Sequence, residues 1–118
     1  MYFEQFSWAI RGDLDVTSLR AAWQHMVDRH PMLRTSFFWE ELDHPMQVVH
    51  RAVTLPMEIH DFRHVPAHEQ DARVNAFLAA DRQRGFALDA APLMRFSLLQ
   101  LGPDSHRFLW SFHHILLD

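Results

Sequence analysis

The spacing of the hydrophobic residues changes several times along this chain, and this alternation constrains the fold more than any other feature. Residues 3–11 carry apolar side chains at alternate positions, which is the pattern of a strand with one apolar face. Gly12 and Asp13 interrupt the strand, and apolar residues then recur at helical spacing as far as Pro31. Asp15 occupies the position expected of a helix N-cap. The chain therefore begins with a strand that leads into a helix.

The rest of the chain continues to alternate between the two periods. Strands are expected over residues 33–39, 46–50 and 57–62, followed by a helix over residues 66–84 that ends at Gly85. Residues 93–101 and 107–112 are expected to form a hairpin around the turn Gly-Pro-Asp-Ser. The order β-α-β-β-β-α-β-β predicts an α+β protein, a two-layer sandwich of helices on a mixed, largely antiparallel sheet. Four tryptophans lie on the apolar faces and are expected in the core: Trp8, Trp23, Trp39 and Trp110.

Composition excludes several classes of function. The 118 residues, 48% of them hydrophobic, suit one folded domain, and the net charge of −4 without a basic run argues against a nucleic-acid partner. The absence of cysteine excludes disulfides, cysteine-ligated zinc and a thiol nucleophile. No signal peptide is evident, and no apolar stretch approaches the ~20 residues of a membrane span. We therefore expect a soluble, cytoplasmic protein without a membrane partner.

Candidate chemistry is concentrated at His113 and His114, which follow an apolar strand. Neighbouring residues of a strand point to opposite faces, so one imidazole can face a cleft while the other packs. Histidine titrates near pH ~6.5 and suits general-base catalysis close to neutrality. Asp118 can orient an imidazole or pair with an arginine. Spacing alone favours the plainer interpretation of two half-buried histidines, because an isolated His-His-x-x-x-Asp is a weak motif.

Three longer stretches change that balance. Residues 29–37 read RHPMLRTSF, residues 84–95 read RGFALDAAPLMR and residues 113–118 read HHILLD, while Gly-Asp-Leu-Asp at 12–15 precedes the first helix. In order and spacing they resemble the condensation-domain family of nonribosomal peptide synthetases. The resemblance implies one lobe of a chloramphenicol acetyltransferase-like fold. Residues 1–118 would be the N-terminal half of a condensation domain, truncated at both ends of the family pattern: the opening motif, the glycine after Asp118 and the second lobe are lacking.

The resemblance also implies a reaction. Family members form an amide bond between an acyl or peptidyl donor and an aminoacyl acceptor, each delivered on the phosphopantetheine arm of a peptidyl carrier protein. No cofactor is bound directly. The implied partners are the upstream and downstream carrier proteins, the missing C-terminal lobe and an adenylation domain in the same polypeptide.

Site residues carried over from the family are few. His114 matches the catalytic histidine, and His113 matches the first histidine of the motif, which is expected to pack. Asp118 is expected to pair with an arginine, with Arg34 as the first choice and Arg95 as the second. Such a pair would hold the loop after His114.

Other interpretations remain open. An epimerization domain or another HxxxD acyltransferase has a similar motif, whereas a heterocyclization domain is disfavoured because its motif carries aspartate in place of His113 and His114. His60, His64 and His68 have a spacing that suits a metal site on one helix, but Pro66 makes a continuous helix improbable there. A non-catalytic fragment that self-associates through exposed apolar residues at 115–117 is the final alternative.

Overall fold

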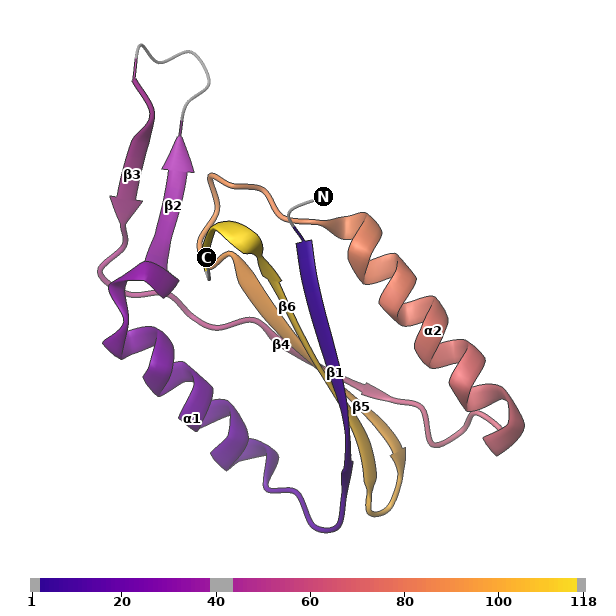
Figure 1. Cartoon of the computed structure of the whole chain (residues 1–118). Helices are drawn as coiled ribbons and strands as arrows, with labels where there is room; N and C mark the ends of the chain where they lie inside the picture. The colour runs from indigo at the N-terminus through magenta and orange to yellow at the C-terminus, as the bar shows by residue number, and fades with distance from the viewer. Residues whose placement is uncertain (1–2, 39–43, 117–118) are drawn as a thin grey trace.

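The computed structural model describes residues 3–38 and 44–116. Two long helices flank a central sheet, and a separate hairpin projects from one end (Figure 1). Two short 3₁₀ helices complete the fold, η1 at Pro31–Arg34 and η2 at His114–Leu116. The main elements are β1 (Phe3–Arg11), α1 (Val16–Arg29), β2 (Thr35–Phe38), β3 (Met46–Val49), β4 (Met57–Asp61), α2 (Ala67–Arg84), β5 (Met94–Gly102) and β6 (Ser105–His113).

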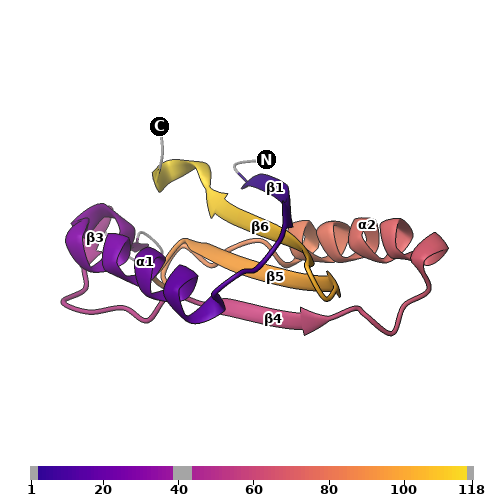
Figure 2. The same cartoon turned by 90° about the horizontal axis from the view of Figure 1, so that it is seen from below.

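The sheet has the strand order β1-β6-β5-β4. β6 pairs antiparallel with both β1 and β5, whereas β4 runs parallel to β5 at one edge (Figure 2). β2 and β3 form the separate antiparallel hairpin. The predicted α+β class and the mixed, largely antiparallel sheet are therefore confirmed. The β5–β6 hairpin places the end of β6 in the interior of the sheet, between β1 and β5.

Both long helices begin and end where the sequence indicates. The Asp15 side chain accepts a hydrogen bond from the Ser18 amide at 3.1 Å and caps α1. Pro31 prevents α1 from continuing, so the helix stops at Arg29. Gly85 follows α2 with a φ of +58°, a conformation that favours glycine, and its amide donates to the Asp81 carbonyl at 3.3 Å.

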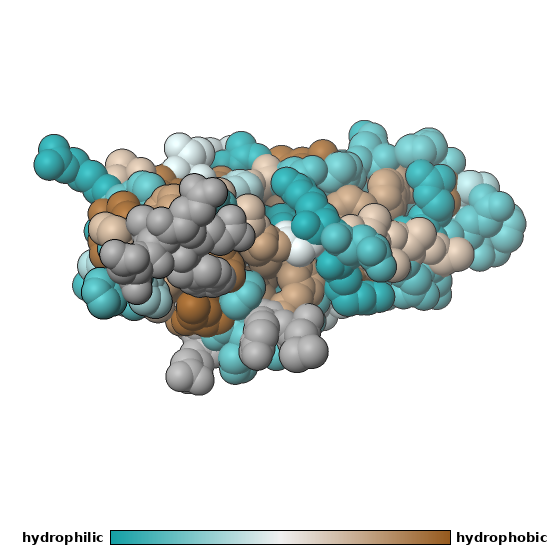
Figure 3. Space-filling view, turned by 90° about the horizontal axis from the view of Figure 1, so that it is seen from above, coloured by the Kyte–Doolittle hydropathy of each residue, from teal (hydrophilic) through white to brown (hydrophobic). Residues whose placement is uncertain are grey.

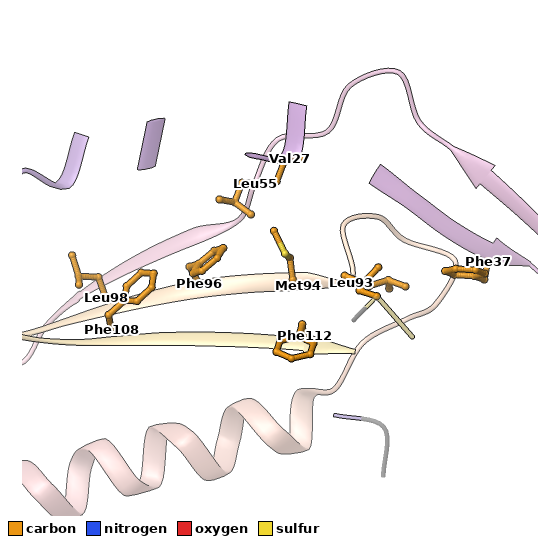
Figure 4. Packing of buried hydrophobic residues seen from close by; sticks show 10 residues of the cluster. Val27, Phe37, Leu55, Leu93, Met94, Phe96, Leu98, Phe108 and Phe112 are labelled. Carbon is orange, nitrogen blue, oxygen red and sulfur yellow. The ribbon is translucent and has the colours of Figure 1, made fainter. Parts of the chain in front are cut away.

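Each face of the sheet packs against one helix through apolar residues. Met94, Phe96 and Leu98 of β5 point toward Val27 of α1, away from α2 (Figure 4). The intervening residues of β5 include Leu99, which packs with Val74 and other apolar residues of α2. The helices therefore lie on opposite faces, giving three layers rather than two, because β5 carries apolar residues on both faces, with buried polar residues among them on the side of α2.

Two further details differ from the sequence prediction. Leu33 and Arg34 belong to η1 instead of the predicted strand, because Pro31 starts a 3₁₀ turn before β2 begins at Thr35. Trp8 is 45% exposed, so its assignment to the core is wrong. It lies on β1, which is an edge strand of the sheet. Trp39 lies outside the described residues.

The surface reflects this arrangement. Hydrophilic residues dominate the right-hand side of the view from above, where α2 lies, and hydrophobic residues are more frequent on the side of α1 and the hairpin (Figure 3). Leu116 is only 6% exposed and packs in the main core. The expectation that residues 115–117 form an exposed apolar patch is therefore wrong at Leu116, and Leu117 lies outside the described residues.

Candidate active site

The two motif histidines lie where β6 ends and the chain turns. His113 is the last residue of β6, and His114 begins η2. The His113 amide donates to the Leu93 carbonyl at 2.9 Å, and His113 is opposite Phe3 in the β1–β6 ladder. The histidine backbone is therefore fixed by a neighbouring strand on one side and the segment before β5 on the other.

The two imidazoles have different environments. The ring Nδ1 of His113 accepts a hydrogen bond from the Ile115 amide at 3.1 Å, which holds the ring inside the turn. Burial lowers the pKa of His113 below its ordinary value, and the neighbouring His114 acts in the same direction. His113 is therefore mainly neutral near pH 7.

His114 is the accessible histidine of the pair. Its side chain is 49% exposed, and its Nδ1 lies 3.7 Å from Oε1 of Glu4, whose side chain is 47% exposed. This separation is longer than a hydrogen bond, so the two side chains are neighbours across the end of β1. An exposed imidazole beside a carboxylate is chemically able to accept a proton or to orient a nucleophile.

Arg34 binds backbone groups within its own part of the fold. Its guanidinium donates to the carbonyls of Val27 and Asp28, at 2.8 and 2.7 Å, and to the carbonyl of His50 at 2.9 Å. Arg34 therefore connects the C-terminal end of α1 to the residue that follows β3. It also satisfies carbonyl groups of the last turn of α1, which have no partner within the helix. Asp118 lies outside the described residues, so its pairing with Arg34 stays a prediction.

Arg95 lies in a different place and has a charged partner. It is buried, and its Nε donates to Oδ1 of Asp81 at 2.6 Å. Its two terminal nitrogens donate to the carbonyls of Asp81 and Gly85 at the end of α2. The guanidinium also lies over the rings of Phe86 and Phe3, 4.4 and 5.6 Å from their centroids. The structure therefore does not bring Arg34 and Arg95 together, and a contact of Arg95 with Asp118 stays a prediction.

Three residues of the hydrogen-bond network around Arg95 were not predicted from the sequence: Asp81, Gln5 and Ser111. Asp81 also accepts from Nε2 of Gln5, at 2.8 Å, and from the Ser111 hydroxyl. A signal was present in the sequence, because Asp81 follows Val74, Phe77 and Leu78 at helical spacing and so falls on the apolar face of α2. A carboxylate on that face requires a buried cationic partner.

The histidines considered for a metal site are on separate elements. His60 is in β4, His68 is in the first turn of α2, and His64 lies between these elements. Within the described ranges, no three histidine, cysteine or acidic side chains are grouped so that they could hold a metal ion. None of the described helices is long and apolar enough to span a membrane.

Comparison with protein families decides the assignment. The model of the family described as "Condensation domain" matches residues 1–118. The chain belongs to the condensation-domain family.

Its relatives are much longer proteins that contain such domains. One of the linear gramicidin synthase proteins of Brevibacillus parabrevis is 48% identical over 117 residues, which are 99% of this chain and 2% of that protein. Bacitracin synthase 3 of Bacillus licheniformis is 38% identical over 117 residues, again 99% of this chain and 2% of the relative. This condensation-domain chain thus spans 2% of the length of these relatives.

Solved structures agree with the fold. The starter condensation domain of rhizomide synthetase RzmA is similar with a TM-score of 0.83 and 26% identity, covering 99% of this chain and 29% of that one. The EpoB cyclization-docking bidomain from Sorangium cellulosum gives a TM-score of 0.84 at 26% identity, covering 97% of this chain and 22% of that one. The expected lobe of a chloramphenicol acetyltransferase-like fold is confirmed.

Proposed function

We propose that this chain is the N-terminal half of a condensation domain that forms amide bonds in nonribosomal peptide synthesis. The observation that carries the proposal is the position of His114, an accessible imidazole at the end of β6 in the second position of the His-His-x-x-x-Asp motif. Membership of the family over residues 1–118 supports the same assignment.

The proposed reaction joins two thioester-bound groups. The amine of the acceptor attacks the carbonyl carbon of the donor thioester, a C–N bond forms, and the C–S bond breaks. The amine loses a proton, and the departing thiolate of the donor arm takes one up. His114 accepts the amine proton or hydrogen-bonds the amine and so orients it.

The size of the effect of removing His114 separates these two roles. General acid–base catalysis typically contributes about 10² to 10⁴ in rate. Holding two tethered reactants together can contribute more, and a second lobe would share that contribution. A small loss on mutation therefore indicates orientation of the amine, and a loss near the upper end of the range indicates proton transfer.

The proposed partners follow from the reaction. An upstream and a downstream peptidyl carrier protein present the substrates on phosphopantetheine arms, and no cofactor is bound directly. An adenylation domain in the same polypeptide loads the acceptor, and the assembly is cytoplasmic. The isolated 118 residues are expected to be inactive, because the proposed C-terminal lobe supplies the other wall of the substrate channel.

The experiment uses the complete condensation domain with both carrier proteins loaded with simple aminoacyl groups. Intact-protein mass spectrometry detects a dipeptidyl group on the downstream carrier if transfer occurs. His114→Ala should abolish or strongly reduce transfer, whereas His68→Ala, an exposed histidine on α2, should leave the rate unchanged.

Two results would replace the proposal. Exchange of the α-hydrogen of a carrier-bound residue without transfer would assign the chain to an epimerization domain. Neither reaction with several substrates would leave a non-catalytic, structural role as the better explanation.

A further inference from the structure

A buried carboxylate, Asp81, joins α2 to three strands of the sheet. Only 7% of Asp81 is exposed, yet its side chain accepts three hydrogen bonds. Arg95 of β5 donates to Oδ1, while Ser111 of β6 and Gln5 of β1 donate to Oδ2. These donors meet the hydrogen-bonding requirement of a charge that would otherwise be costly to bury.

The three donors form one row across the sheet. Ser111 is directly opposite Gln5 in the β1–β6 ladder and directly opposite Arg95 in the β5–β6 ladder. Residues in register on adjacent strands point to the same face, which here is the face covered by α2. A single carboxylate therefore fixes the position of α2 relative to three strands at the same level.

The row of Gln5, Ser111 and Arg95 lies next to the motif histidines. Ser111 is two residues before His113, so both side chains belong to the same face of β6. Phe3 lies opposite His113 in the ladder, and the ring of Phe3 lies beside the Arg95 guanidinium. The row formed by Gln5, Ser111 and Arg95 therefore lies close to the point where the chain turns from β6 into His114.

We propose that Asp81, acting through the Ser111 hydroxyl, is a positioning residue that sets the orientation of the His113–His114 segment for the transfer reaction. This inference rests on the function proposed above. Without the Ser111 hydroxyl, the end of β6 loses its direct bond to α2, while the Arg95–Asp81 pair and the surrounding core remain. A displacement of about 1 Å at a reacting group lowers rates by up to ~10²-fold.

The test compares two buried serines on the same face of the sheet. Ser97 of β5 is 4% exposed and lies two residues after Arg95, but it is not among the described donors to Asp81. In the complete condensation domain, Ser111→Ala should lower the rate at saturating carrier proteins by roughly 10-fold, with little change in the half-saturating carrier concentration. Ser97→Ala should leave both quantities near wild type, and Ser111→Thr, which keeps the hydroxyl, should recover most of the rate.

A second readout does not depend on activity. Ring resonances of His113 and His114 in selectively labelled protein should shift in Ser111→Ala and stay in place in Ser97→Ala. A wild-type rate with unshifted rings in Ser111→Ala overturns the positioning role, as do equal losses in the two alanine variants. If the wild-type domain itself performs no transfer, the proposed function fails, and the histidine resonances alone then decide whether Asp81 and Ser111 orient the segment.

Discussion

Replacing Arg95 with methionine should expose how strongly the fold depends on the Arg95–Asp81 pair. Methionine retains much of the arginine side-chain volume but removes three hydrogen bonds of 2.6–2.7 Å, one of them to the Asp81 carboxylate. Asp81 would remain buried with only its neutral donors. Removing one partner of a buried pair costs about 3–5 kcal/mol, so Arg95→Met should lower the free energy of unfolding by ~4 kcal/mol.

A second substitution, Asp81→Asn, tests the pair more directly. Its effect on the free energy of unfolding should have opposite signs in the wild-type protein and in the Arg95→Met variant. Asp81→Asn in the wild-type protein leaves Arg95 without its anion and should destabilise by about 3 kcal/mol. In the Arg95→Met background the same change removes an unpaired buried charge and should restore roughly 2 kcal/mol. The double variant should then lie about 2 kcal/mol below wild type, rather than the ~7 kcal/mol expected of independent effects.

Urea denaturation followed by tryptophan fluorescence measures these changes, since Trp23 and Trp110 pack against Phe96 in the core. With a slope of ~2 kcal/mol/M, Arg95→Met should lower the midpoint by about 2 M, and adding Asp81→Asn should raise it again by ~1 M. If Asp81→Asn lowers the midpoint equally in both backgrounds, Arg95 does not compensate the charge of Asp81, and the assignment of this pair as a stabilising unit is wrong.

Two further predictions concern a glycine and a histidine. Gly85→Ala should destabilise by about 1–3 kcal/mol, because a φ of +58° strains the backbone of a residue with a side chain. A steric clash does not contribute, since the new Cβ would have no neighbour within 4 Å. Gly102→Ala, where the new Cβ meets Ser105 at 3.7 Å without a positive φ, should have a smaller effect in the same denaturation assay. Because burial lowers the pKa of His113, the unfolded state binds more protons below the ordinary value of 6.5, and stability should decrease as pH falls through this window. His113→Asn should reduce that pH dependence of the urea midpoint, and an unchanged dependence would show that other groups cause it.

Most of the fold is predictable from local signals. Asp15, Pro31 and Gly85 mark the ends of α1 and α2, and the structure confirms each of them. These positions act through backbone geometry and neighbouring hydrogen bonds, which depend little on tertiary context. The apolar-rich segment of residues 93–101 similarly predicts β5 to within one residue at each end.

The number of layers and the buried network depend on contacts between distant residues. The assignment of α2 to the face of Leu99 depends on both faces of β5 being covered by helices. The spacing of apolar residues along the sequence does not show this. Gln5, Asp81 and Ser111 meet only after β1, β6 and α2 have assembled. The exposed position of Trp8 has the same origin, since the sequence does not reveal that β1 is an edge strand.

The row of donors around Asp81 also constrains how this domain can be recombined with its relatives. Its members are separated by 76, 30 and 14 positions from Asp81 along the chain, at Gln5, Ser111 and Arg95. A crossover between residues 5 and 111 therefore draws the carboxylate and at least one of its donors from different parents. Chimeric synthetases joined outside this interval inherit the whole set from one parent, whereas internal junctions require both parents to carry compatible residues at all four positions.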